Sequence, residues 1–187
     1  MDRQAIEKER EELLHRMVDD LQEGLIAAQY REPEVKGDIP VVSVLFDEFG
    51  DGEDEAYGEF FFRPILTDED QVQFFSGIIT LADSLPEEHL NELFQAMSYI
   101  NFQLPCGCFA LDKTKSLLVF RECIPLPIEL KGDALFEQMN LISGNAVASA
   151  DAYISTLLQV AEGELSVEDV IELLTFSEGE QDTDEQD

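Results

Sequence analysis

Three cysteines are the residues whose type and spacing come closest to forming a chemical site. Cys106 and Cys108 flank a single glycine, and Cys123 follows on the next predicted strand. Thiolates bind zinc well, but a structural zinc site needs four ligands, and the sequence does not place His15, His89 or a carboxylate as the fourth. A redox pair usually has two residues between its cysteines, not one. The cysteines still leave one function open as an alternative to protein binding, that of a small metal-binding protein or a thiol-dependent enzyme. We predict no cofactor.

Other motifs that would carry chemistry are missing from the sequence. It has no nucleophile elbow, no phosphate-binding glycine loop and no His-Glu-x-x-His motif. The acidic segment 47–55 lacks the alternating ligands and the closing glutamate of an EF-hand calcium loop, so a solvated turn fits it better. These observations predict a protein that has no catalytic residues, holds no metal and is not an enzyme.

The sequence is strongly acidic. Its 187 residues include 42 Asp and Glu but 11 Lys and Arg, which gives a formal net charge of −31. Nucleic acids and anionic membranes are bound through clustered cations, so this composition excludes both as partners. A basic protein partner fits the charge, because a negative field attracts cations; the alternative is that the charge only maintains solubility. We expect Arg63 and Arg121, which are cations inside predicted strands, to neutralise nearby carboxylates.

The sequence also indicates a cellular compartment. Its N-terminal residues lack the apolar stretch of a secretory signal, and its longest apolar runs, such as 41–46 and 74–81, are too short to span a bilayer. An odd number of cysteines is typical of reduced thiols in a cytosol. We therefore expect a soluble cytoplasmic protein.

Hydrophobic periodicity predicts an α+β fold with the order α-β-β-β-α-β-β-α and a short C-terminal helix. The expected elements are a helix over 3–29, strands over 41–46, 57–65 and 72–81, a helix over 84–100, strands over 107–111 and 117–124, a helix over 133–162 and a last helix over 166–174. Together they form a twisted five-stranded antiparallel sheet flanked by helices. We predict one domain over residues 1–174 and a disordered acidic tail over 175–187.

Local signals mark three helix ends. Ser84 and Glu87 have the spacing of a capping box, so the second helix should begin there. Gly163 should stop the long helix, because glycine readily adopts the left-handed conformation that follows many helices. Ser166 can cap the short last helix.

Both faces of the predicted sheet carry apolar side chains. Within the strand 72–81, for example, Phe75 and Ile79 point to one face, whereas Phe74 and Ile78 point to the other. An antiparallel sheet with one solvated face would instead alternate apolar and polar residues. We therefore expect both faces to be covered, either by helices of the same chain or, on one face, by a second subunit or a bound partner.

The second predicted hairpin sharpens this expectation. A turn centred between Lys113 and Thr114 would pair Cys108 with Val119 and Phe109 with Leu118. One face would then carry bulky residues, and the other would carry smaller residues, Arg121 and the three cysteines. We predict that this smaller face binds a partner or a second copy of the chain. The predicted partner-binding residues are Phe74, Ile78, Cys108, Ala110, Leu117 and Val119.

The end of the second helix and the hairpin after it also support a resemblance. The helix ends in Met97-Ser98-Tyr99-Ile100-Asn101, Gly107 opens the hairpin at Gly107-Cys108-Phe109-Ala110-Leu111-Asp112, and the next strand covers 117–121. With the order of elements over residues 4–162, this arrangement resembles the YbjN-type branch of the type III secretion chaperone-like fold superfamily.

The resemblance implies a protein-binding function. Secretion chaperones of this superfamily hold non-globular segments of secreted proteins through apolar grooves and sheet edges, and its members are small, acidic, cytoplasmic and often dimeric. YbjN-type members are linked to stress and regulation, with no settled activity. The chain differs from this pattern in a longer first helix, an acidic hairpin loop and an acidic extension after Gly163. The resemblance therefore implies a chaperone-like or regulatory module that binds proteins, is not an enzyme and forms homodimers.

Overall fold

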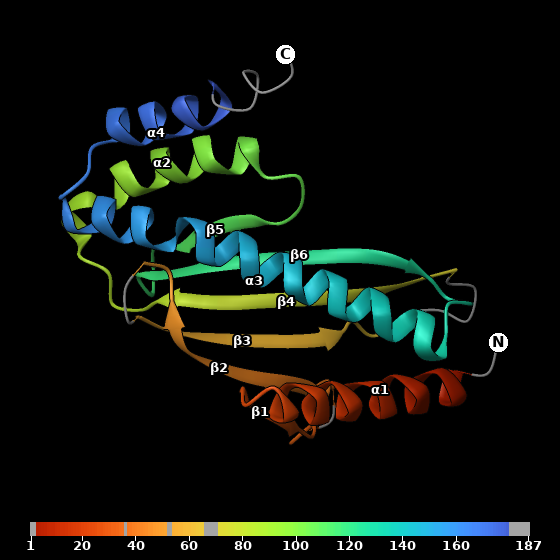
Figure 1. The fold of residues 1–187 in the computed structure, drawn as a ribbon. Coiled ribbons are helices and arrows are strands. Elements are labelled where there is room, and N and C mark those ends of the chain that lie inside the picture. Colours follow the sequence, from red (N-terminus) through yellow and green to blue (C-terminus); the bar gives the residue numbers. More distant parts are fainter. Residues whose placement is uncertain (1–2, 36, 52–53, 66–70, 180–187) are drawn as a thin grey trace, which may run out of the picture.

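The computed structural model of the protein describes residues 3–35, 37–51, 54–65 and 71–179. These residues form an α+β fold around one antiparallel sheet with the strand order β1-β2-β3-β4-β6-β5 (Figure 1). The strands are β1 (Ala27–Arg31), β2 (Val41–Phe49), β3 (Asp54–Phe62), β4 (Val72–Ala82), β5 (Cys108–Asp112) and β6 (Leu117–Pro127). The prediction of an α+β fold with an antiparallel sheet is confirmed, but the sheet has six strands and not five.

The additional strand, β1, comes from the end of the predicted first helix. Helix α1 (Arg3–Glu23) stops well before residue 29. Leu25 adopts a positive φ of 63° and is 94% exposed, and the Ile26 N–H donates to the Leu21 carbonyl across the turn. Leu25 and Ile26 continue the helical spacing of apolar residues in the sequence, so periodicity alone could not locate this turn.

The other helix ends agree with two of the three local signals. Helix α3 (Gly132–Glu162) ends at Gly163, which has a φ of 77° and donates its N–H to the carbonyls of Gln159 and Val160. Ser166 begins α4 (Val167–Gly179), because its hydroxyl and the Asp169 carboxylate each bond to the other residue's backbone N–H. Helix α4 passes residue 174, so the predicted tail starts inside a helix, and 180–187 lie outside the described residues.

The capping box at Ser84 was a wrong prediction. Ser84 itself has a positive φ of 56°. A short 3-10 helix, η1 (Glu87–His89), precedes α2 (Leu90–Gln103), and neither has a side-chain cap. The segment before this helix is fixed instead by a residue distant in sequence, because the Leu85 N–H donates to the Ser116 carbonyl and Leu85 is buried.

All four described α-helices lie on the same side of the sheet (Figure 1). Side chains from α1 and α3 pack with those of β2, β3 and β4 in one cluster. Side chains from α2, α3 and the β5–β6 hairpin form a second cluster, which α4 joins through Val170. The largest buried residues on this covered face are Phe60, Phe75 and Phe120. No described helix lies over the other face, so the expectation that helices of this chain could cover both is wrong for the described residues.

The second hairpin keeps its predicted faces although its predicted register was wrong. Phe109 pairs with Phe120, and Ala110 pairs with Val119. This register differs from the expected one by two residues, and a shift of two leaves every side chain on its original face. The turn is set by Asp112, whose carboxylate accepts from the Thr114 N–H at 2.9 Å and from the Thr114 hydroxyl at 2.6 Å. None of the described helices is long and apolar enough for a membrane span.

Candidate functional site

The candidate site is the open face of the sheet, defined as the side chains that point away from the helices. The structure brings all six predicted partner-binding residues onto this face, on the adjacent strands β4, β6 and β5. Thr80 lies beside Val119, which lies beside Ala110. Ile78 and Cys108 lie on either side of Arg121 in the next row. The remaining members of the predicted set are Phe74, which pairs with Pro125, and Leu117, which pairs with Asp112.

The open face extends beyond the six predicted partner-binding residues. Leu45 of β2 pairs with Tyr57 of β3, and Phe61 of β3 pairs with Ser76 of β4. Leu45 is 39% exposed and Phe74 is 38% exposed, whereas their covered-face neighbours Val44 and Phe75 are 1% and 0% exposed. The signal for these additional residues was present, because simple alternation along 41–46 and 57–65 already assigned them to this face.

Side chains occupy part of the backbone at both edges of the sheet. At the β5 edge, the Asn101 side chain accepts from the Phe109 N–H at 2.7 Å and donates to the Phe109 carbonyl at 3.1 Å. At the β1 edge, the Gln22 amide donates to the Ala28 carbonyl at 2.8 Å. An edge strand whose backbone groups are partly occupied is a poorer template for an added strand than a free one. The face of the sheet is therefore the better candidate site than either edge.

The same contacts explain the motif from Asn101 to Gly107. Gly107 has a φ of 72°, and a Cβ atom built on it would lie 2.4 Å from the Phe120 ring. Glycine thus lets the chain turn from α2 into β5 directly against a buried ring. Asn101 then fixes β5 by a side chain that imitates a neighbouring strand. In this chain the motif positions an edge strand and contributes no reactive group.

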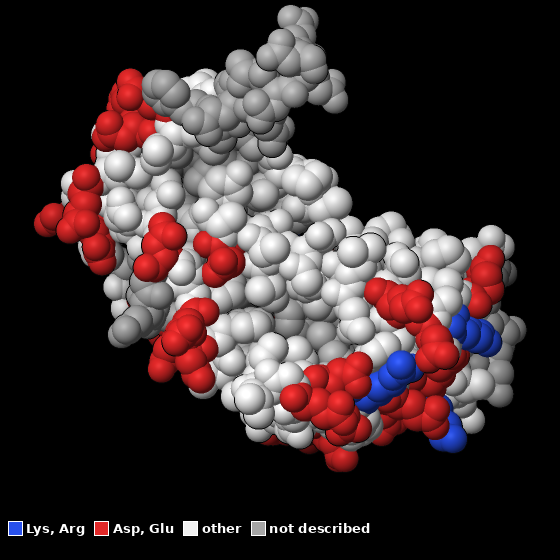
Figure 2. All heavy atoms as spheres, in the orientation of Figure 1, with Lys and Arg blue, Asp and Glu red and all other residues white. Residues whose placement is uncertain are grey.

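The open face carries exposed cations. Arg31, Arg63 and Arg121 lie on it and are exposed, and Glu59 lies among them. Arg31 forms an ion pair with Glu59. No carboxylate among the described residues pairs with Arg63 or Arg121, so the expectation that they neutralise nearby carboxylates was wrong for this part of the chain. Figure 2 shows the side on which α3 passes in front of the sheet, where acidic side chains are scattered over the surface and a few basic side chains lie at one end.

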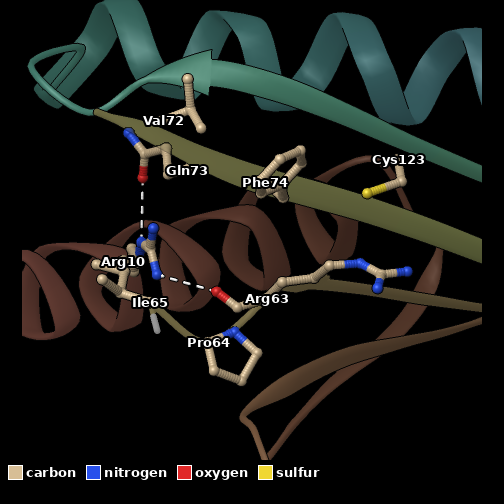
Figure 3. Close-up of a pocket in the computed structure, with 8 residues that line it drawn as sticks. All are labelled: Arg10, Arg63, Pro64, Ile65, Val72, Gln73, Phe74 and Cys123. Carbon is tan, nitrogen blue, oxygen red and sulfur yellow. Dashed lines mark hydrogen bonds between the residues drawn. The ribbon is translucent and has the colours of Figure 1, made fainter. Parts of the chain in front are cut away.

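A cavity of about 400 Å³ opens at one end of this face, where β3 and β4 separate (Figure 3). The Phe74 ring and Cys123 border it on one side, and Arg10 of α1 borders it on the other. The Arg63 carbonyl faces Arg10, whereas the Arg63 guanidinium extends the opposite way, toward Cys123 in this view. The full lining is Arg10, Arg63, Pro64, Ile65, Val72, Gln73, Phe74 and Cys123.

Arg10 is a buried cation, with 5% of its surface exposed. Its Nε donates to Gln73 Oε1 at 3.0 Å, its Nη1 donates to the Arg63 carbonyl at 3.2 Å, and its guanidinium lies 4.8 Å from the centre of the Phe62 ring. Its remaining nitrogen, Nη2, is buried and has no hydrogen-bond partner among the described residues. Burial lowers the pKa of Arg10 to about 10, against the raising effect of Glu7, so it stays charged at neutral pH.

Gln73 holds Arg10 in place from the sheet. Its amide nitrogen donates to the carbonyls of Pro127 and Leu130, both at 3.2 Å, while its oxygen accepts from Arg10. Sequence reasoning did not single out Arg10 or Gln73. A signal existed for Arg10, because it occupies a position of the apolar stripe between Ile6 and Leu14, where a charged residue interrupts the helical pattern.

The cysteine hairpin does not assemble a metal centre in the described part of the chain. Cys106 lies outside β5 and is exposed, Cys108 is half-buried, and Cys123 is exposed. No three Cys, His, Asp or Glu side chains among the described residues are placed to hold a metal ion together. This geometry gives no support to a metal site at the three cysteines within the described residues.

Comparison with known proteins adds no relative to this picture. No protein-family model matches the chain, and no curated protein matches it. The resemblance to the type III secretion chaperone-like superfamily therefore stays a prediction.

Proposed function

We propose that this protein is a cytoplasmic, chaperone-like or regulatory module that binds a non-globular segment of a partner protein on the open face of its sheet. The observation that carries the proposal is the position of the helices. All four described α-helices lie on one face, and the opposite face exposes apolar side chains from β2, β3, β4 and β6.

The composition of this face suits protein binding. Desolvation of aromatic and aliphatic groups is the main favourable term when proteins associate, and arginine is enriched at the sites that contribute most. The open face offers Phe74, Ile78 and Val119 for the first contribution and Arg63 and Arg121 for the second.

Charge should act on a partner differently at long range and at contact. At long range the net charge of −31 attracts a basic segment. At contact the exposed arginines of the open face favour an acidic group, because charges on the rest of the surface are screened beyond about 8 Å at physiological ionic strength. A partner segment of mixed charge, with apolar residues between its charges, satisfies both. A second copy of the chain is also a candidate, and we propose that the protein forms homodimers through this face.

The test is photocrosslinking in the native cells. The photoreactive amino acid p-benzoylphenylalanine replaces Val119 on the open face in one variant and Leu141 of α3, which is 58% exposed, in a matched control. We expect Val119 to capture a defined set of proteins or a second copy of the chain, and Leu141 to capture neither. Adding Ile78→Asp to the first variant should remove the captured species. Equal capture at both positions, or none at Val119, would contradict the proposal.

A further inference from the structure

Arg10 presents an anomaly for a chain with so many carboxylates. Of the 42 Asp and Glu residues in the sequence, none among those described pairs with this buried guanidinium. Its visible partners are neutral, an amide oxygen and a backbone carbonyl. A buried charge normally has a paired charge or a complete set of hydrogen bonds, and Arg10 Nη2 has neither among the described residues.

The cavity beside Arg10 combines this cation with an apolar wall. Ile65, Val72 and Phe74 supply the apolar surface. The Arg63 guanidinium, whose Nε donates to Ser76 Oγ at 3.2 Å, marks the other end of the same cavity (Figure 3). A volume of about 400 Å³ lies within the range of small-molecule sites.

These features select the chemistry of a ligand. Guanidinium groups bind carboxylates through charge-assisted hydrogen bonds, which are about twice as strong as neutral ones. An apolar wall favours a hydrocarbon chain over a small hydrated ion. We propose that the cavity binds a carboxylate carried on a short apolar chain, with the carboxylate at Arg10 and the chain along Phe74. The carboxylate belongs either to a free small acid or to the C-terminus of a peptide.

The test uses the full chain labelled with ¹⁵N and three probes of similar length: hexanoate, hexanamide and hexylamine. Titration at pH 7 is followed by NMR through the Arg10 Nε–H, the Gln73 side-chain amide and the backbone amides of Val72 and Phe74. Hexanoate should shift these signals and saturate. Hexanamide should bind at least tenfold more weakly, and hexylamine should not bind at these residues.

Three variants locate the carboxylate. Arg10→Lys keeps the charge but cannot reproduce the planar array of donors, so hexanoate should bind at least tenfold more weakly. Arg63→Gln should weaken hexanoate severalfold. Arg121→Gln removes the same charge from the same face but does not line the cavity, so the affinity should change less than twofold. The amide spectrum away from the cavity shows whether each variant remains folded.

Two results would overturn the proposal. One is equal affinity for hexanoate and hexanamide, which would make the cavity apolar only. The other is an equal loss in Arg63→Gln and Arg121→Gln, which would indicate general attraction to a cationic face. A control titration with inorganic phosphate should show weaker binding than hexanoate, because phosphate has no apolar chain.

A final arm separates the two sources of the carboxylate. N-acetyl-Ala-Ala-Leu is compared as the free acid and as the C-terminal amide. Binding of the acid at least tenfold tighter than hexanoate assigns the site to a peptide C-terminus, and weaker binding assigns it to a small acid. This site does not rest on the proposed protein binding. Hexanoate can bind even if no protein is captured at Val119, and a protein can be captured at Val119 even if hexanoate does not bind. The two proposals can therefore fail separately.

Discussion

Phe74 and Phe75 are neighbours in β4, yet they belong to two different surfaces. Phe75 is 0% exposed beneath α1 and α3, whereas Phe74 is 38% exposed on the open face beside the cavity. Both faces carry apolar side chains in the sequence, but the two faces differ in what covers them. An apolar side chain therefore identifies a surface that can be buried, and the path of the helices decides whether this chain buries it.

The largest effect should come from truncating these two rings in turn. Phe75→Ala should lower the free energy of unfolding by about 3–5 kcal/mol, because it leaves a cavity in the core. Phe74→Ala should lower it by about 1 kcal/mol, because much of that ring already contacts solvent. Urea denaturation measures both. Similar losses in the two variants would mean that the open face is covered after all.

The next effect concerns the edge of the sheet rather than its faces. Asn101→Ala leaves the N–H and carbonyl of Phe109 without their side-chain partner and should cost about 1–3 kcal/mol. It should also increase aggregation, because it exposes an edge strand. Asn91→Ala is the control, since Asn91 only accepts from Lys113 on the surface. Thermal denaturation and light scattering test the pair, and indistinguishable variants would argue against the edge-blocking role.

The open face should respond to charge through association and not through folding. Val119 is half-buried, so Val119→Asp should change the free energy of unfolding by about 1 kcal/mol or less. The same substitution should convert a dimer into a monomer, because it would place an unpaired charge in the interface. Sedimentation equilibrium at micromolar concentration, with Leu141→Asp as the control, measures this. A wild-type protein that is already monomeric would refute self-association.

The smallest effect should come from Glu122, a buried carboxylate on the covered face, where β6 pairs it with Gly77. Burial raises the pKa of Glu122 above the 4.5 of an ordinary glutamate. The folded state then binds a proton more tightly than the unfolded state, so stability falls as pH rises from the unfolded pKa through the folded one. Glu122→Gln should be more stable than wild type at pH 7, and the difference should vanish well below pH 4.5. The exposed Glu129→Gln is the control in thermal melts at each pH.

Several predictions from the sequence held because they depend on neighbouring residues. Gly163 ends α3 and Ser166 caps the start of α4, and both boundaries depend on the conformation of a few neighbouring residues. The faces of the β5–β6 hairpin also held, although its register was misjudged by two residues, because alternation survives a shift of two. The predicted start of α2 was wrong, because the Leu85 N–H is bound by the Ser116 carbonyl, which is distant in sequence.

The sequence by itself determined the α+β class, the antiparallel sheet and the side-chain alternation that sorted six residues onto one face. These follow from periodicity and turn chemistry, which act over a few residues. The tertiary structure alone decided that β1 leaves the first helix, that all the described helices share one face, and that Arg10 meets Gln73 across 63 positions of chain. Such features depend on contacts between residues that are distant in sequence, and no local pattern specifies them.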